Sequence, residues 1–194
     1  QLTQLSHLYI SYINLSSLLV IIGHLTNLTY LNITKINLTS LPNSIGQLSQ
    51  LTHLHISYNN LTSLPDDIGQ LSQLTYLDIS RNKLTSLSDS IGQLIKLTDL
   101  DISHNSSLRT LPVSLHNISS TLWRFNCVEC VALTSPPYAV CKQGLLAVRR
   151  FLKDLDLERG QNQTLVPVTV IGKSRAGKTS LVRSLQQNKR ILTQ

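Results

Sequence analysis

The chain has 194 residues, of which 41% are hydrophobic and 14% are charged, with a formal net charge of +7. This composition excludes a disordered chain, and the length allows one mid-sized domain and part of another. The longest apolar run, residues 18–22, is too short to span a bilayer. Three cysteines, an odd number, do not make a disulfide framework.

The positive charge is concentrated toward the C-terminus. Residues 1–121 carry five basic and six acidic side chains, whereas residues 122–194 carry twelve basic and four acidic ones. These basic groups are spread over an expected helix, a loop and a second helix, with few aromatic residues between them. We therefore expect no nucleic-acid partner. The chain starts in mid-pattern and contains no Met, so we expect it to be part of a longer protein.

A sequence repeat with a period of 23 residues dominates the chain. LTHLHISYNNLTSLPDDIGQLSQ (51–73) is followed directly by LTYLDISRNKLTSLSDSIGQLIK (74–96). Further copies begin at residues 5, 28 and 97, the last with an insertion after Asn105, and a degenerate sixth begins at residue 122. The pattern resembles the leucine-rich repeat, L-x-x-L-x-I-x-x-N-x-L, over residues 1–137. The resemblance implies an α/β solenoid of about six repeats with a parallel sheet on its inner, concave face.

The spacing within one copy predicts which side chains form the core. Leu51, Leu54 and Ile56 alternate as a short inward-facing strand should, and Asn59 then turns the chain. Further leucines and isoleucines return from the convex side, where Gly69 allows a tight turn. Because one coil cannot bury its leucines alone, successive coils are expected to stack. The first two copies have Ile13 and Ile36 in place of the asparagine, and we expect these coils to be less regular.

Cys127 and Cys130 have the C-x-x-C spacing of a metal or redox pair. The repeat register instead places Cys127 at the inward isoleucine position and Cys130 at the turn position. With no second pair of ligands in the sequence, we expect buried core thiols.

The strand positions that face solvent are candidates for binding a protein or peptide. Five of the six tyrosines and four of the six histidines fall in these columns, although aromatic residues make up only 5% of the chain. Tyrosine and arginine are favoured at interaction hot spots. The alternative is a solvated sheet in which tyrosine serves strand propensity. The candidates are His7, Tyr9, Tyr12, Tyr30, Asn32, Lys35, His53, His55, Tyr58, Tyr76, Asp78, Arg81, Asp99, Asp101 and His104.

Residues 138–164 follow the repeats as an expected capping helix and linker. Val140, Leu145, Val148, Leu152 and other apolar residues share one helical stripe that could close the open end of the solenoid. The polar stretch 158–164 is turn-like and predicts a short linker.

Residues 165–194 predict the first strand, phosphate loop and helix of an incomplete P-loop NTPase domain. The segment 172–179, GKSRAGKT, matches G-x-x-x-x-G-K-[ST] between a β-branched run and an expected helix. Backbone N–H groups of the loop and the helix N-terminus would face the phosphates, Lys178 would reach the β- and γ-phosphates, and Thr179 would ligate Mg²⁺. The expected nucleotide-binding residues are Gly172, Lys173, Ser174, Arg175, Ala176, Gly177, Lys178, Thr179 and Ser180.

The order of these segments, with repeats first, then a connector such as PPYAVCKQGLLAVRRFLKDL, then the loop, resembles the Roco family. In that family leucine-rich repeats precede a Roc GTPase domain. The resemblance implies a cytoplasmic signalling protein that binds GTP or GDP with Mg²⁺, hydrolyses GTP slowly and recruits partners through the repeats. Some members continue into a dimerising region and a serine/threonine kinase, which this chain does not contain.

Two departures qualify this interpretation. Ser174 and Arg175 stand where small GTPases often have glycine, and the chain contains no N-K-x-D motif to read guanine. One strand and one helix bury too little surface to fold as a nucleotide domain, so we expect the chain as it stands to be a protein-interaction module without GTPase activity. The alternatives are a leucine-rich adaptor with a vestigial phosphate loop, or an ATP-using relative.

Overall fold

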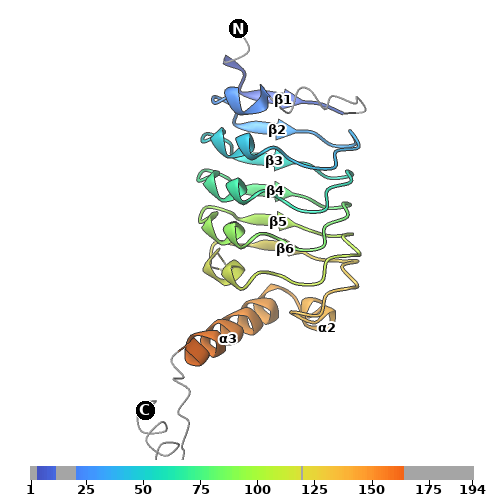
Figure 1. Ribbon diagram of the computed structural model, residues 1–194, viewed down its shortest axis with the longest axis vertical. Helices are drawn as coiled ribbons and strands as arrows, with labels where there is room; N and C mark the ends of the chain where they lie inside the picture. Colours follow the sequence, from blue (N-terminus) through green and yellow to red (C-terminus); the bar gives the residue numbers. More distant parts are fainter. Residues whose placement is uncertain (1–3, 12–20, 119, 164–194) are drawn as a thin grey trace, which may run out of the picture. The chain divides into compact units, whose positions relative to one another are not determined.

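A six-stranded parallel sheet runs through the computed structural model, which describes residues 4–11, 21–118 and 120–163 (Figure 1). Each strand has three residues, and the strands follow one another in chain order. They are β1 (His7–Tyr9), β2 (Tyr30–Asn32), β3 (His53–His55), β4 (Tyr76–Asp78), β5 (Asp99–Asp101) and β6 (Arg124–Asn126). The expected solenoid with a parallel sheet is confirmed.

The register of the sheet reproduces the sequence period. Tyr30 pairs with His53, and His53 pairs with Tyr76, so equivalent residues of neighbouring coils lie side by side. In the last strand pair the paired residues are more than 23 positions apart in the sequence, as in the pairing of Asp99 with Arg124. The fifth coil accommodates its inserted residues without loss of strand pairing.

Each of the first five coils returns along the opposite side of the solenoid through a short 3₁₀ helix (Figure 1). These helices are η2 (Ile22–His24), η3 (Asn43–Gln47), η4 (Asp66–Gln70), η5 (Asp89–Gln93) and η6 (Val113–Ile118). Their close stacking explains the repeated glycine: a Cβ on Gly69 would lie 2.7 Å from the backbone oxygen of Ser90. No larger residue fits there unless the neighbouring coil moves.

The core is a continuous column of leucine and isoleucine inside the coils. Leu51, Leu54, Ile56 and Ile68 are all fully buried, as the repeat spacing predicts. Equivalent positions in the neighbouring coils belong to the same apolar cluster. Ile22 and Leu25 are buried as well, so the C-terminal end of the apolar run at 18–22 contributes to this core.

Buried asparagines after β3, β4 and β5 connect neighbouring coils. The Oδ1 atom of Asn59 accepts hydrogen bonds from the backbone N–H groups of Ile36 and Leu38, in the preceding coil. Its Nδ2 atom donates to the carbonyl oxygens of Ile33 and Ile56. Asn82 and Asn105 make equivalent bonds. Asn59 thus accepts the backbone hydrogen bonds at the turn of the preceding coil, which has Ile36 in place of an asparagine.

Cys130 takes the asparagine position in the last coil, as expected from the repeat register. Its thiol donates to the carbonyl oxygen of Ile102, and both Cys130 and Cys127 are buried. The inserted residue after Asn105 explains why a thiol suffices there. It lets the N–H of Leu108 bond to the carbonyl of Asn105 within the same coil, so no amide oxygen from the next coil is needed.

Two helices, α2 (Tyr138–Cys141) and α3 (Leu145–Gln163), follow the last coil. The expected single helical stripe is broken at Gly144, which has a left-handed φ of 93°. Val148 and Leu152 of α3 are buried against the core, so this helix caps the solenoid as predicted. The helix continues to Gln163, through most of the stretch in which the sequence indicated a turn-like linker.

Candidate functional site

The solvent-facing side of the sheet, here called the strand face, contains two columns of side chains. In each three-residue strand the middle residue points into the core and the two flanking residues point outward. The first column is His7, Tyr30, His53, Tyr76, Asp99 and Arg124, and the second is Tyr9, Asn32, His55, Asp78, Asp101 and Asn126. The structure therefore brings together the strand candidates that the sequence indicated.

Six aromatic and imidazole rings pack side by side across β1 to β4, in stacked or tilted pairs, and form what we call the ring ladder: His7, Tyr9, Tyr30, His53, His55 and Tyr76. Successive centroids are 4.8 Å apart between Tyr9 and Tyr30, 5.1 Å between Tyr30 and His55, and 4.6 Å between His55 and Tyr76. Such spacings are those of favourable ring pairs. The ladder offers a broad, rigid surface for a partner.

Three carboxylates occupy the next part of the strand face, on β4 and β5. One oxygen of Asp101 accepts bonds from the backbone N–H and the hydroxyl of Ser103, and Asp78 bonds to Ser80 in the same way. These short-range bonds orient both carboxylates. The third carboxylate, Asp99, lies 3.5 Å from the Nε atom of Arg124.

The carboxylates and the rings affect one another electrostatically. Burial and the negative charges of Asp78 and Asp101 raise the pKa of Tyr76 above its ordinary value. Burial lowers the pKa of His55, although Asp78 opposes this effect. The Nδ1 atom of His55 lies 3.9 Å from an Asp78 oxygen. His55 is therefore neutral near pH 7, and the β4–β5 part of the strand face is negative.

A third set of candidates, the edge column, lies where the chain leaves each strand: Lys35, Tyr58, Arg81 and His104. All four have a left-handed backbone, with φ between 52° and 57°. Lys35 and Arg81 lie over the Tyr58 ring, with Nζ and Cζ at 5.0 and 4.9 Å from the centroid. Cation–π contact thus orders a basic strip beside the strand face.

Two residues of the strand face were not among the sequence candidates. Arg124 and Asn126 extend the two columns onto β6, and the amide of Asn126 donates to Asp101. The alternation of polar and apolar residues around Phe125, typical of a strand, was the signal that could have identified them. Together with Tyr76, Asp99, Leu100 and Asp101, they line a small hollow of about 60 Å³.

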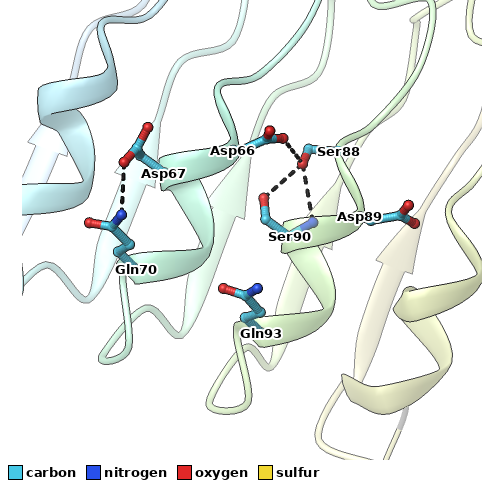
Figure 2. Close-up of a pocket in the computed structure, with 7 residues that line it drawn as sticks. All are labelled: Asp66, Asp67, Gln70, Ser88, Asp89, Ser90 and Gln93. Carbon is cyan, nitrogen blue, oxygen red and sulfur yellow. Dashed lines mark hydrogen bonds between the residues drawn. The ribbon is translucent and has the colours of Figure 1, made fainter.

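A larger hollow of about 550 Å³ lies on the opposite side, between η4 and η5 (Figure 2). Its polar side chains bond mainly to one another: Ser88 donates to Asp66 and caps the N–H of Ser90, and Gln70 donates to Asp67. The bond between Ser88 and Asp66 joins the two neighbouring coils, and the other two bonds lie within one coil, so these polar side chains have a structural role.

Several sequence candidates lie outside the described residues, namely Tyr12 and the whole phosphate-loop segment 172–180, including Thr179 as the expected Mg²⁺ ligand. Within the described ranges no group of three or more His, Cys, Asp or Glu side chains could hold a metal ion. Both cysteines of the C-x-x-C pair are buried in the core cluster. A search of the same ranges finds no helix with the length and apolar character needed to cross a membrane.

Comparison with known families agrees with this architecture. A family model described as leucine rich repeat matches residues 26–84, 49–106 and 72–121. The match and the stacked coils together make this a leucine-rich repeat protein. A comparison with curated proteins gives no significant match.

Several solved structures are similar. The plant peptide hormone receptor RGFR1, solved in complex with RGF2, is 30% identical with a TM-score of 0.58, over 66% of this chain and 21% of that one. The ectodomain of the receptor kinase SOBIR1 from Arabidopsis thaliana is 28% identical with a TM-score of 0.51. That match covers 59% of this chain and 64% of the SOBIR1 chain. The Arabidopsis receptor kinase HAESA, in complex with the peptide hormone IDA and the co-receptor SERK1, is 24% identical with a TM-score of 0.50, over 64% and 26%. This chain spans less than two thirds of each.

Proposed function

We propose that the strand face is a recognition surface for a protein or an extended peptide segment. The ring ladder is the observation that carries this proposal. Six rings aligned across four strands present aromatic area with little rotational freedom, so a partner can bury them at low entropic cost. A sheet that served only the fold would not need rings in both outward columns.

The similar structures support the proposal. The plant peptide hormone receptor RGFR1, which is 30% identical over the matched part, was solved in complex with RGF2. We extend peptide or protein recognition to this chain as a hypothesis, with the edge column flanking the contact surface.

The test is selection of binders from a displayed library of random twelve-residue peptides. We expect the double substitution Tyr58→Ala and Tyr76→Ala to lower the affinity for the selected peptides at least tenfold. Tyrosines are frequent hot spots, and their truncation to alanine removes much of the binding energy. Ile95→Ala with Leu146→Ala, at positions 64% and 76% exposed away from the strand face, is the matched control and should leave binding unchanged. Equal effects of both pairs would contradict the proposal.

We propose, second, that residues 165–194 begin a Roc-like GTPase domain, so that the natural protein is a cytoplasmic switch with a partner-recruiting arm. The motif GKSRAGKT at 172–179 favours this proposal over an adaptor with a vestigial loop. In it Lys178 contacts the phosphates of GTP or GDP, and Thr179 holds Mg²⁺. A homodimer would be formed by a downstream region, as in the family that the chain resembles.

Lys178→Ala in the natural full-length protein tests the second proposal. We expect the substitution to abolish binding of a fluorescent GTP analogue, whereas Lys189→Ala, beyond the loop, retains it. Competition by unlabelled ATP and GTP then distinguishes guanine from adenine specificity. Wild-type protein that binds neither nucleotide would support the adaptor alternative.

A further inference from the structure

The strand face changes character along the solenoid. Its β1 to β4 part consists mainly of rings, whereas β4 and β5 carry Asp78, Asp99 and Asp101, opposed on the two columns only by Arg124 of β6. Residues 1–121 carry six acidic side chains, and three of them lie in this zone. A partner that covers the ring ladder reaches the carboxylates next, since both occupy the same columns.

The small hollow lies at the junction of these two zones. It measures about 60 Å³ and is lined by the Tyr76 ring, by Asp99 and Asp101, and by Arg124 and Asn126. A water needs roughly 15 Å³ of such space, so the hollow holds a polar group of several heavy atoms. The aromatic residue comes from β4, both carboxylates come from β5, and Arg124 and Asn126 come from β6.

Arg124 shows which group approaches these carboxylates. Its Nε atom lies 3.5 Å from Asp99 while its side chain is 83% exposed. An ion pair this exposed contributes little, so a partner can displace it readily. The chain's own guanidinium thus stands where a guanidinium from a partner would bind.

Resting on the proposed recognition function, we infer that the partner presents an arginine side chain, which inserts beside Tyr76 and binds Asp99 and Asp101. The planar guanidinium satisfies both requirements of the hollow, because it stacks on an aromatic face and donates paired hydrogen bonds to carboxylates. These carboxylates already accept hydrogen bonds from Thr98, Ser103 and Asn126. A guanidinium adds charged donors to them, whereas an apolar side chain would desolvate the carboxylates without adding a donor. The carboxylates that raise the pKa of Tyr76 act on the same ring, in keeping with a negative potential there.

The first experiment uses small probes and does not depend on the natural partner. The protein, with ¹³C-labelled tyrosine, is titrated with N-acetylarginine amide and with N-acetylcitrulline amide, its neutral isostere. We expect the Tyr76 ring signals to shift saturably with the arginine probe and at least fivefold less with the citrulline probe. Equal shifts with both probes, or no shift with either, would overturn the inference.

Matched variants locate the effect. Asp99→Asn with Asp101→Asn keeps the side-chain shapes and should weaken binding of the arginine probe at least tenfold. Asp66→Asn with Asp89→Asn removes the same charge from the opposite side of the solenoid and should change the affinity for the arginine probe less than twofold. Arg124→Gln removes the competing guanidinium and should raise the affinity for the probe two- to fivefold. Equal effects of the two aspartate pairs would contradict a site at the hollow.

Peptides selected by display separate the two proposals. Selected peptides that lack arginine and bind the Asp99→Asn, Asp101→Asn protein as well as the wild type would defeat the inference and leave strand-face recognition intact. A response of Tyr76 to the arginine probe, with no peptide selected, would defeat peptide recognition and leave the guanidinium site. Peptides enriched in lysine, with arginine absent, would also overturn the arginine assignment.

Discussion

At the scale of single residues, the buried asparagines connect the sequence pattern most directly to stability. Asn59 has only 7% of its side chain exposed, yet its amide serves N–H and C=O groups of two coils. These backbone groups would otherwise be buried without partners at the turns. Asn59, Asn82 and Asn105 are therefore structural residues rather than binding residues.

Asn59→Ala tests this role. We expect it to lower the free energy of unfolding by roughly 3 kcal/mol, because several buried backbone groups lose their partner. Asn60→Ala is the control: Asn60 donates its backbone N–H to Leu38, and the substitution keeps that bond. Urea denaturation followed by circular dichroism measures both, and equal losses would contradict the assigned role.

A second prediction at this scale concerns pH. Burial places the pKa of His55 below its ordinary value of 6.5, so the unfolded chain binds the proton more readily than the folded one. Stability should accordingly fall as the pH drops below about 6.5, and it should level off once the pH is below the folded pKa. Asp78 opposes the shift and His53 adds to it.

His55→Gln removes this titration. Thermal melting between pH 7.5 and pH 5 should show a smaller loss of Tm in the variant than in the wild type. A variant with the same or a steeper loss would show that His55 does not titrate as described.

At the scale of elements, the 3₁₀ helices and the cap show how neighbouring units fit. Each glycine of the I-G-Q pattern lies against the next coil, and α3 covers the last coil of the solenoid. Packing, not hydrogen bonding within the element, determines both arrangements.

Gly69→Ala tests the fit between η4 and η5. The new Cβ would lie 2.5 Å from Oε1 of Gln93 and 2.7 Å from the Ser90 carbonyl, which is backbone and cannot rotate away. Overpacking of this kind costs about 1–3 kcal/mol, measurable as a lower urea midpoint. Ser72→Ala, at an exposed neighbouring position, should leave the midpoint unchanged.

Leu152→Ala tests the cap. Leu152 is 1% exposed against the core, and its truncation should cost about 3 kcal/mol. Leu146, in the same helix, is 76% exposed, and its substitution by alanine should cost less than about 0.5 kcal/mol. Similar unfolding midpoints for the two variants would mean that α3 does not close the solenoid.

At the scale of the whole solenoid, stability depends on how many neighbours each coil has. Leu54 in β3 is fully buried between two coils, whereas the equivalent Leu8 in β1 is only partly buried. In such a one-dimensional stack, terminal units open most easily.

Hydrogen exchange measures this gradient. We expect amides of β3, β4 and β5 to exchange most slowly and those of β1 to exchange first. Uniform protection along the described strands would indicate a single cooperative unit instead.

The sequence alone determined the coils, because a 23-residue period with fixed leucine positions permits only one inward face. It also determined the outward columns and the burial of Cys127 and Cys130, which follow from the register. The tertiary structure decided what depends on distances between coils, since side chains 23 or more residues apart meet only after stacking. The ring ladder, the sharing of Tyr58 between Lys35 and Arg81, and the hollow beside Arg124 are of this kind. The break at Gly144 and the end of α3 at Gln163 also came from the structure, because the apolar periodicity that indicated one helical stripe marks neither a left-handed residue nor a helix end within a polar stretch.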